Sequence, residues 1–304
     1  MITFRAMSQA IPYFGEILAL LTAMTWAVAV ILFKKSGEKV HPIALNLFKN
    51  FLAVILFIPT MWLFGETLFR NVPARDYYLL LLSGALGIGL SDTLFFKSLN
   101  YLGAGMHAIV NCLYSPSIIG LSVIWLGESM TALQIIGAAM IVSAVLTATS
   151  KKGKGNLSRH NLFWGVLLGV IATAASAVGI VMIKTLLERS PLLWATELRL
   201  FGGIAVLLIV LVFHSDRRRL LGSLMAANSK GYTISSSIMG AYFSMVLWLA
   251  GMKYTQASIA SALNQTSNIF VFIFAALLLR EPINLQRIIG ISLGVIGALL
   301  VTFG

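Results

Sequence analysis

The sequence predicts an all-α integral membrane protein with ten transmembrane helices in two inverted five-helix repeats. Three observations support this. Of the 304 residues, 59% are hydrophobic and only 11% are charged, whereas an average soluble domain is about 25% charged. Apolar runs long enough to span a bilayer recur along the whole chain. The second half also repeats polar and glycine positions of the first. A soluble chain of this size could not bury so much apolar surface.

Each expected span is an apolar run of about 20 residues, the length that crosses a hydrocarbon core ~30 Å thick. The spans have to be helical, because backbone amides in lipid need partners within their own segment. Transmembrane strands would instead show alternating segments of about ten residues. The expected spans are residues 14–33, 43–64, 76–97, 105–126, 130–149, 162–186, 193–213, 231–252, 256–279 and 283–303.

Short connections place neighbouring spans antiparallel. Residues 127–129 join spans four and five, and residues 280–282 join spans nine and ten. The longest polar stretches are 150–161 and 214–230. We interpret 150–161 as a basic linker between a first repeat, 1–149, and a second repeat, 162–304.

The repeat rests on charged, glycine and polar residues that match in register. At a shift of 150 the matching pairs are Gly15 with Gly165, Lys34 with Lys184, and Lys49 with Arg199. At a shift of 153 they are Asn111 with Asn264, Glu128 with Glu281, and Gly137 with Gly290. Because five crossings bring the chain to the opposite side, the second half is inserted upside down. Inverted repeats of this kind are typical of transporters that work by alternating access.

Two cations lie within the expected spans. Lys49 and Arg199 are each about seven residues inside a span, which at 1.5 Å per residue is roughly 10 Å along the helix. A cation at that depth needs a partner or water. The pair could hold an anionic group such as a substrate carboxylate. The alternative is a structural role, with the side chains reaching an interface or backbone carbonyls.

Two ionisable groups break the repeat. Asp92 in span three corresponds to Met245, and His107 at the start of span four corresponds to Ala260. A carboxyl group in a low dielectric can carry a proton, and both groups lie toward the same end of adjacent antiparallel helices. They are therefore candidates for proton coupling. The alternative is a satisfied structural pair, such as Asp92 with Lys97 or with a backbone amide.

The most polar spans are eight and nine. Runs of amides and hydroxyls at membrane depth line a cavity or bond between helices. We expect a central cavity built from spans three, four, eight and nine. Its candidate polar residues are Asn111, Ser236, Asn264, Gln265 and Asn268, and its candidate aromatic walls are Tyr114, Tyr242 and Trp248. Packing is the alternative role for the aromatics. For Glu197, an interhelical partner such as Lys34 or Lys184 competes with a substrate.

An ordered set of motifs resembles the drug/metabolite transporter superfamily in its ten-helix EamA-like form. The first half carries Trp26, Lys34, Pro42, Lys49-Asn50-Phe51, Ser115-Pro116, Leu126-Gly127-Glu128 and Ile136-Gly137; the second carries Lys184, Pro191, Arg199, Glu281 and Gly290. Two positions depart from the pattern. Ser176 stands opposite Trp26, and Asn268-Ile269 replaces Ser-Pro in span nine, which leaves no reason to expect the same bend in both halves. The resemblance implies an exporter or exchanger of small metabolites, amino acids or drugs.

We therefore expect a secondary transporter, acting as an exporter, in the inner (plasma) membrane. Its partners would be a small-molecule substrate, the lipid bilayer and protons, as a monomer or homodimer. An intramembrane enzyme is disfavoured by the lack of HExxH, GxSxG or paired aspartates in adjacent spans. A channel or scaffold is the other alternative. The lone Cys112 and four scattered histidines suggest no metal site, and no cofactor is expected.

The chain carries 22 Lys and Arg against 10 Asp and Glu, a net charge of +12. These cations sit mostly in short turns between apolar runs, which is typical of inner-membrane proteins and not of nucleic-acid binding. If the N-terminus were inside, most of the loop cations would lie outside. The positive-inside rule therefore predicts that both termini lie outside, whereas the family resemblance implies termini inside.

Overall fold

A computed structural model describes residues 11–126, 131–149, 157–226, 230–255, 260 and 263–303. Within these residues the regular structure is helical. Seven described helices are long and apolar enough to cross a membrane, and the shorter apolar helices Ala132–Ala148, Leu263–Leu278 and Leu285–Val301 supply the remaining spans. The predicted fold class, a multi-pass membrane protein with ten helices in two repeats, is confirmed.

The first repeat holds five spans, two of them built from several helical pieces. These are α2 (Phe14–Gly37), α3 (Pro42–Leu63), the third span of α4 (Ala74–Gly84), η1 (Ala85–Leu90) and α5 (Ser91–Leu102), the fourth span of α6 (Ala104–Asn111) and α7 (Tyr114–Leu126), and α8 (Ala132–Thr149).

The second repeat follows the same plan, with one helix that the sequence did not predict, α12 in the loop after span seven. Its elements are α9 (Arg159–Val181) with the short α10 (Lys184–Arg189), α11 (Leu192–Phe213), α12 (Arg217–Ala226), the eighth span of α13 (Lys230–Ser237), η2 (Ile238–Ser244) and α14 (Met245–Tyr254), the ninth span with α16 (Ser267–Leu278), and α17 (Leu285–Phe303).

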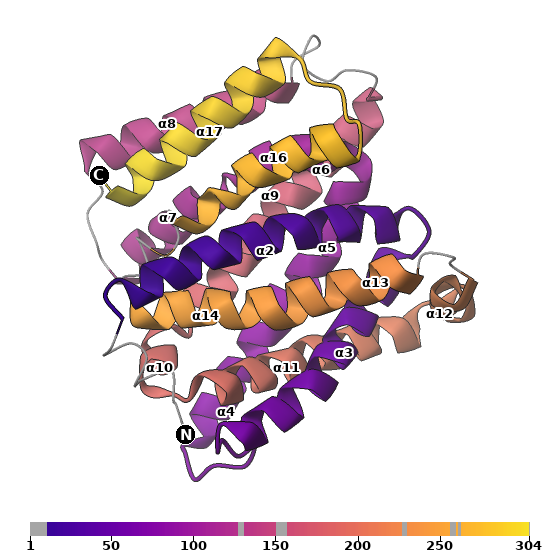
Figure 1. Ribbon diagram of the computed structural model, residues 1–304, viewed down its shortest axis with the longest axis vertical. Coiled ribbons are helices and arrows are strands. Elements are labelled where there is room, and N and C mark those ends of the chain that lie inside the picture. Colours follow the sequence, from indigo (N-terminus) through magenta and orange to yellow (C-terminus); the bar gives the residue numbers. More distant parts are fainter. Residues whose placement is uncertain are drawn as a thin grey trace.

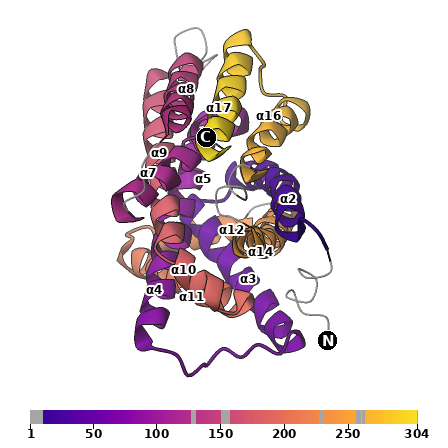
Figure 2. The same cartoon turned by 90° about the vertical axis from the view of Figure 1, so that its left-hand side faces the viewer.

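The spans stack side by side, with α8 and α17 at one end of the stack and α3, α4 and α11 at the other (Figure 1). A view turned by 90° shows the same order (Figure 2). Small residues let α8 and α17 approach closely, because a Cβ atom on Gly137 would lie 2.6 Å from the carbonyl oxygen of Gly297. These two helices pack against each other away from the centre of the molecule.

Local sequence explains where helices begin. Pro42 occupies the first turn of α3, where its missing N–H costs nothing. His41 caps this helix, since its Nδ1 accepts a hydrogen bond of 3.3 Å from the Ile43 N–H. Burial lowers the pKa of His41, and the nearby Lys97 and His214 lower it further. The imidazole is therefore neutral at pH 7 and can act as the acceptor. Ser158 caps α9 in the same way, accepting from the Asn161 N–H.

Both repeats contain a π-helical segment at the equivalent place in the third span. Residues 85–90 of η1 correspond to residues 238–243 of η2 at the shift of 153. Segments of this type in α-helices are frequent at functional sites. Spans four and nine are also interrupted at equivalent positions, at residues 112–113 and at Thr266. The helix is therefore interrupted at the same place in both halves. This was not expected from the sequence, because Asn268-Ile269 stands in span nine where span four has Ser115-Pro116.

Each repeat packs its first helix against the third span of the other repeat. α2 lies along α13, η2 and α14, and α9 lies along η1 and α5. Within each repeat an equivalent lysine reaches the end of the third span. Lys34 Nζ donates to the Asn100 carbonyl at 3.4 Å, and Lys184 Nζ donates to the Met252 carbonyl at 2.9 Å. A cation at a helix C-terminus is favourable for the helix dipole.

Loops rich in cations meet at one end of the molecule. The His41 N–H donates to Ser223 Oγ of α12 at 3.1 Å, which places Lys34, Lys35 and Lys39 at the same end as the arginines that open α12. Figure 1 shows α12 beside the end of α13. The cations that these two loops contribute to the orientation argument therefore lie at the same end of the molecule. Which side of the membrane this end occupies stays a prediction.

Gly202 allows a close contact between α11 and α4, because a Cβ atom there would lie 1.9 Å from the Leu81 carbonyl oxygen. Gly202→Ala should therefore push the helices apart and destabilise the protein by about 1–3 kcal/mol, the usual cost of overpacking. Thermal unfolding of the detergent-purified protein measures the effect. Gly120→Ala is the matched control, since nothing lies within 4 Å of its Cβ position. Equal midpoints for the two variants would contradict this packing.

Candidate functional site

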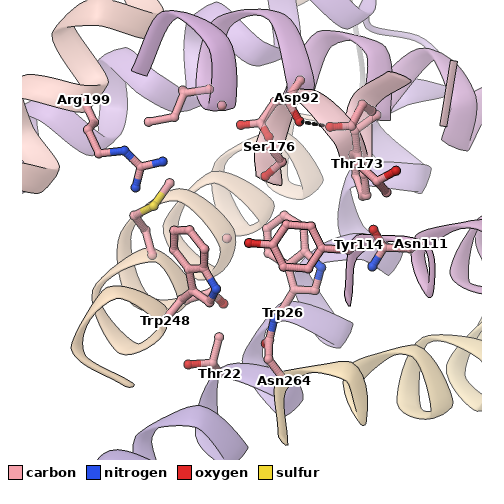
Figure 3. Close-up of a pocket in the computed structure, with 18 of the residues that line it drawn as sticks. Thr22, Trp26, Asp92, Asn111, Tyr114, Thr173, Ser176, Arg199, Trp248 and Asn264 are labelled. Atoms are coloured by element: carbon pink, nitrogen blue, oxygen red, sulfur yellow. Dashed lines mark hydrogen bonds between the residues drawn. The ribbon is translucent and has the colours of Figure 1, made fainter. Parts of the chain in front are cut away.

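A cavity of about 130 Å³ lies between the two repeats (Figure 3). A single buried water needs roughly 10–15 Å³ of such a cavity, so this one can hold a small solute. Its walls come from the first, third and fourth spans of both repeats and from α11. The residues labelled in Figure 3 are Thr22, Trp26, Asp92, Asn111, Tyr114, Thr173, Ser176, Arg199, Trp248 and Asn264.

Several lining residues occupy equivalent positions in the two repeats. The lining pairs are Thr22 with Ala172, Trp26 with Ser176, Gly87 with Gly240, Ser91 with Ser244, Asp92 with Met245, and Asn111 with Asn264. The cavity therefore lies on the pseudo-symmetry axis of the fold. From the sequence we expected the cavity among spans three, four, eight and nine, with Arg199 of span seven as a candidate ligand of the substrate; spans one and six were not expected to line it. The difference between Trp26 and Ser176 at equivalent positions could have indicated that spans one and six line the cavity.

Arg199 enters the cavity from α11 and has no carboxylate within ion-pair distance among the described residues. Its Nε donates to Ser83 Oγ at 3.0 Å, and its guanidinium carbon lies 5.5 Å from the centre of the Trp248 ring. One terminal nitrogen has no hydrogen-bond partner in the described part of the chain. Figure 3 shows the guanidinium pointing past Trp248 into the open space. Arg199 is thus a buried cation without a counterion within the described ranges.

Lys49, the repeat equivalent of Arg199, is neutralised. Its Nζ lies 2.6 Å from Asp92 Oδ2 and 3.1 Å from Asn50 Oδ1. The Lys49 side chain is 5% exposed and that of Asp92 is 20% exposed. Asp92 therefore stands between Lys49 and the cavity, and only Asp92 lines it. Lys97 or a backbone amide was the structural alternative suggested for Asp92 from the sequence; in the structure its ion-pair partner is Lys49.

His107 lines the cavity from α6. Its Nδ1 lies 2.9 Å from Ser98 Oγ, and its ring meets the Phe95 ring edge-on with the centres 4.5 Å apart. Nε2 has no partner among the described residues. Asp92 and His107 thus share one cavity, each with its own neighbour, Lys49 and Ser98 respectively.

The polar run of span nine divides between two roles. Asn264 lines the cavity together with Asn111 of span four. Asn268 accepts a hydrogen bond of 3.0 Å from Asn111 Nδ2 and donates to Gln265. Asn268 therefore joins spans four and nine, and Gln265 bonds to Asn268 from within span nine; neither residue lines the cavity.

Of the remaining predicted cavity residues, two line the cavity and two do not. Trp248 and Tyr114 line the cavity, whereas the Tyr242 hydroxyl lies 2.6 Å from Thr60 Oγ1 and its ring packs on Phe57. Ser236 donates to the Thr233 carbonyl at 3.1 Å within its own helix.

Glu197 is fully buried, and neither carboxyl oxygen has a partner in the described residues. The two lysines suggested as its partners bond elsewhere. Lys34 donates to the Asn100 carbonyl, and Lys184 pairs with Glu188 at 2.9 Å. The expected interhelical ion pair of Glu197 with either lysine is therefore absent.

Comparison with known proteins matches nearly the whole chain. The model of the EamA-like transporter family covers residues 13–150 and 163–303. An uncharacterized transporter of Archaeoglobus fulgidus is 25% identical over 285 residues, covering 92% of this chain and 96% of the relative. The uncharacterized transporter YvbV of Bacillus subtilis is 27% identical over 220 residues, 70% of this chain and 68% of its own. A protein of known crystal structure shares the fold, with a TM-score of 0.69, 15% identity and coverage of 95% and 96%.

The Lys49–Asp92 pair generates a test of the buried charges. Lys49→Met should destabilise the protein by about 3–5 kcal/mol, because it leaves a buried carboxylate without its partner. Adding Asp92→Asn should recover much of that loss. Thermal unfolding in detergent measures all three proteins. Glu188→Gln, which breaks the exposed pair with Lys184, should cost less than about 1 kcal/mol. A double variant as unstable as Lys49→Met would show that the two charges do not depend on each other.

Proposed function

The chain belongs to the EamA-like transporter family, and from that premise we propose that it carries small metabolites across the inner (plasma) membrane by alternating access. The observation that carries the proposal is the cavity between the repeats, whose walls come in equivalent pairs from the two halves. Two halves of similar build and opposite insertion can exchange conformations and so expose one site to each side in turn.

A closed contact at one end fits this cycle. Glu281, in the turn before α17, accepts hydrogen bonds from the backbone N–H groups of Ala104 (2.7 Å) and Gly105 (3.0 Å) at the start of α6. Its repeat equivalent, Glu128, lies outside the described residues. In the proposed cycle the Glu281 contact breaks when the two halves exchange roles.

The wall chemistry favours a substrate that carries a carboxylate. Arg199 offers a charged group to the cavity and has no counterion in the part of the chain that the structure describes. A guanidinium matches the two oxygens of a carboxylate. Trp26 and Trp248 supply apolar surface for the rest of the molecule. Small metabolites such as amino acids, or drug-like solutes with an acidic group, fit both features. The proposed direction is export.

Asp92 is the proposed coupling group. It faces the cavity on one side and Lys49 on the other, so protonation of its carboxyl group would release Lys49 and change the charge of the wall. The equivalent position of the second repeat holds Met245, which supports a role for Asp92 beyond the shared scaffold. His107, which lines the same cavity, is the second candidate for this role.

Counterflow in proteoliposomes tests the function. Vesicles loaded with unlabelled amino acids should transiently accumulate the radiolabelled form above its external concentration, because a carrier exchanges one molecule for another. A channel, the competing function, only equilibrates the label. Saturable counterflow is the expected result, and simple equilibration across a broad amino-acid panel would contradict the carrier.

The same vesicles test proton coupling. Asp92→Asn should abolish uptake driven by a pH gradient and leave counterflow largely intact, because exchange needs no net proton movement. Asp216→Asn, at an exposed loop position, is the matched control and should change neither activity. Normal gradient-driven uptake by well-folded Asp92→Asn protein would remove Asp92 from the mechanism.

A further inference from the structure

We propose that α12 and the loops beside it bind the headgroups of anionic phospholipids at the membrane surface. This surface lies outside the cavity, so the proposal does not depend on what the cavity binds. We call it the basic surface. Its exposed cations are Lys39, Arg217, Arg218, Arg219 and Lys230.

The helix α12 lies at the end of the spans. Its ten residues extend about 15 Å, half of a hydrocarbon core ~30 Å thick, so it cannot cross a membrane. Figure 1 shows α12 beside the end of α13. Leu220 is buried in the core, and Leu224 is partly buried against it. Ser223 Oγ accepts the His41 N–H at 3.1 Å. The helix is thus fixed where lipid headgroups begin.

Two contacts bring the other cations of the basic surface to α12. The bond of His41 to α12 places Lys39, two residues earlier, beside that helix. Ser36 Oγ lies 2.6 Å from Thr233 Oγ1, so the start of α13, with Lys230, lies at the end of α2. No cation of the basic surface forms an ion pair with another described residue.

The charges of α12 are unfavourable for the helix itself. Arg217, Arg218 and Arg219 form its first turn, where the helix dipole favours anions and disfavours cations. Arg217 has a structural contact, since it donates to the Val212 carbonyl at the end of α11 at 3.4 Å. A bound anion beside Arg218 and Arg219 would offset both the dipole and the repulsion between the arginines.

The acidic side chains of the same loops are too few to neutralise the basic surface. Between residues 38 and 41 and between 214 and 230, Glu38 and Asp216 stand against the five cations. Clusters of Lys and Arg next to a membrane attract anionic lipids. The excess of positive charge therefore favours an anionic partner.

Exposed apolar side chains beside these cations favour a lipid over a soluble anion. Leu221 is 40% exposed and lies three positions after Arg218, on the same face of α12. Phe213, at the end of α11, is 84% exposed. A soluble phosphate uses the cations alone. A phospholipid places its phosphate against the arginines and its glycerol and acyl parts against the apolar side chains.

The opposite end of the spans supplies a matched control. α3 begins beside α12 and ends at this other end, where Arg189 Nη2 lies 2.7 Å from Asp76 Oδ1. Arg70, in the loop after α3, and Arg75, in the first turn of α4, are exposed like Arg218 and Arg219. Replacing either pair removes the same charge from the protein.

Lipid titration of the delipidated full-length protein in detergent tests the proposal. The probes are phosphatidylglycerol and phosphatidylcholine with the same acyl chains, and native mass spectrometry measures the dissociation constant of each. The wild-type protein should bind phosphatidylglycerol on the order of tenfold more tightly, because each nearby cation favours the anionic headgroup. Arg218→Gln/Arg219→Gln should bring this ratio close to one, and Arg70→Gln/Arg75→Gln should keep it.

Arg218→Lys/Arg219→Lys retains the charge and should keep most of the preference, which separates a charge effect from a loss of folding. Glycerol 3-phosphate, a soluble phosphate without acyl chains, should not displace the lipid at an equal concentration. An unchanged ratio in Arg218→Gln/Arg219→Gln, or an equal loss in Arg70→Gln/Arg75→Gln, overturns the proposal. So does displacement by glycerol 3-phosphate, which would indicate a site for soluble anions.

Discussion

The guanidinium of Arg199, buried between two repeats without a counterion among the described residues, is the constraint on which the site depends. A cation at this depth is tolerated only with hydrogen bonds, an aromatic face or water around it. Ser83 and Trp248 supply the first two. The backbone around Arg199 can approach the third span because Gly84 has no Cβ atom, which would lie 1.8 Å from the Arg199 carbonyl oxygen. Arg199 also lines a cavity large enough for a small solute.

The two repeats share a scaffold and differ in chemistry. Equivalent π-helical segments, equivalent breaks in spans four and nine, and reciprocal packing of first and third spans give the cavity symmetric walls. The groups on those walls are not symmetric. Lys49 is neutralised by Asp92, and Arg199 is not neutralised. Similar halves support the alternating geometry of the proposed carrier, and the unlike residues are the groups proposed to select the substrate and to bind a proton.

The sequence predicted the spans and the repeat well because hydropathy and register are local properties of the chain. It did not predict η1 and η2, since a π-helical turn changes the hydrogen bonding of a helix without changing its apolar content. Neighbours in a polar run were also hard to separate. Asn264 and Gln265 point in different directions, and only packing decides which of them lines the cavity. Lys49 and Asp92 are 43 residues apart in the sequence. Their pairing depends on how α3 and α5 pack, which the local sequence does not reveal.

We propose that a carboxylate substrate supplies the counterion that Arg199 lacks among the described residues. The most direct measurement is the thermal unfolding midpoint of the purified protein with lactate and with its neutral amide. Lactate should raise the midpoint and lactamide should not, and Arg199→Gln should remove the response. Arg287→Gln, which alters a buried arginine that bonds the Pro282 carbonyl outside the cavity, should keep it. Equal stabilisation by acid and amide, or an undiminished response in Arg199→Gln, would contradict the account.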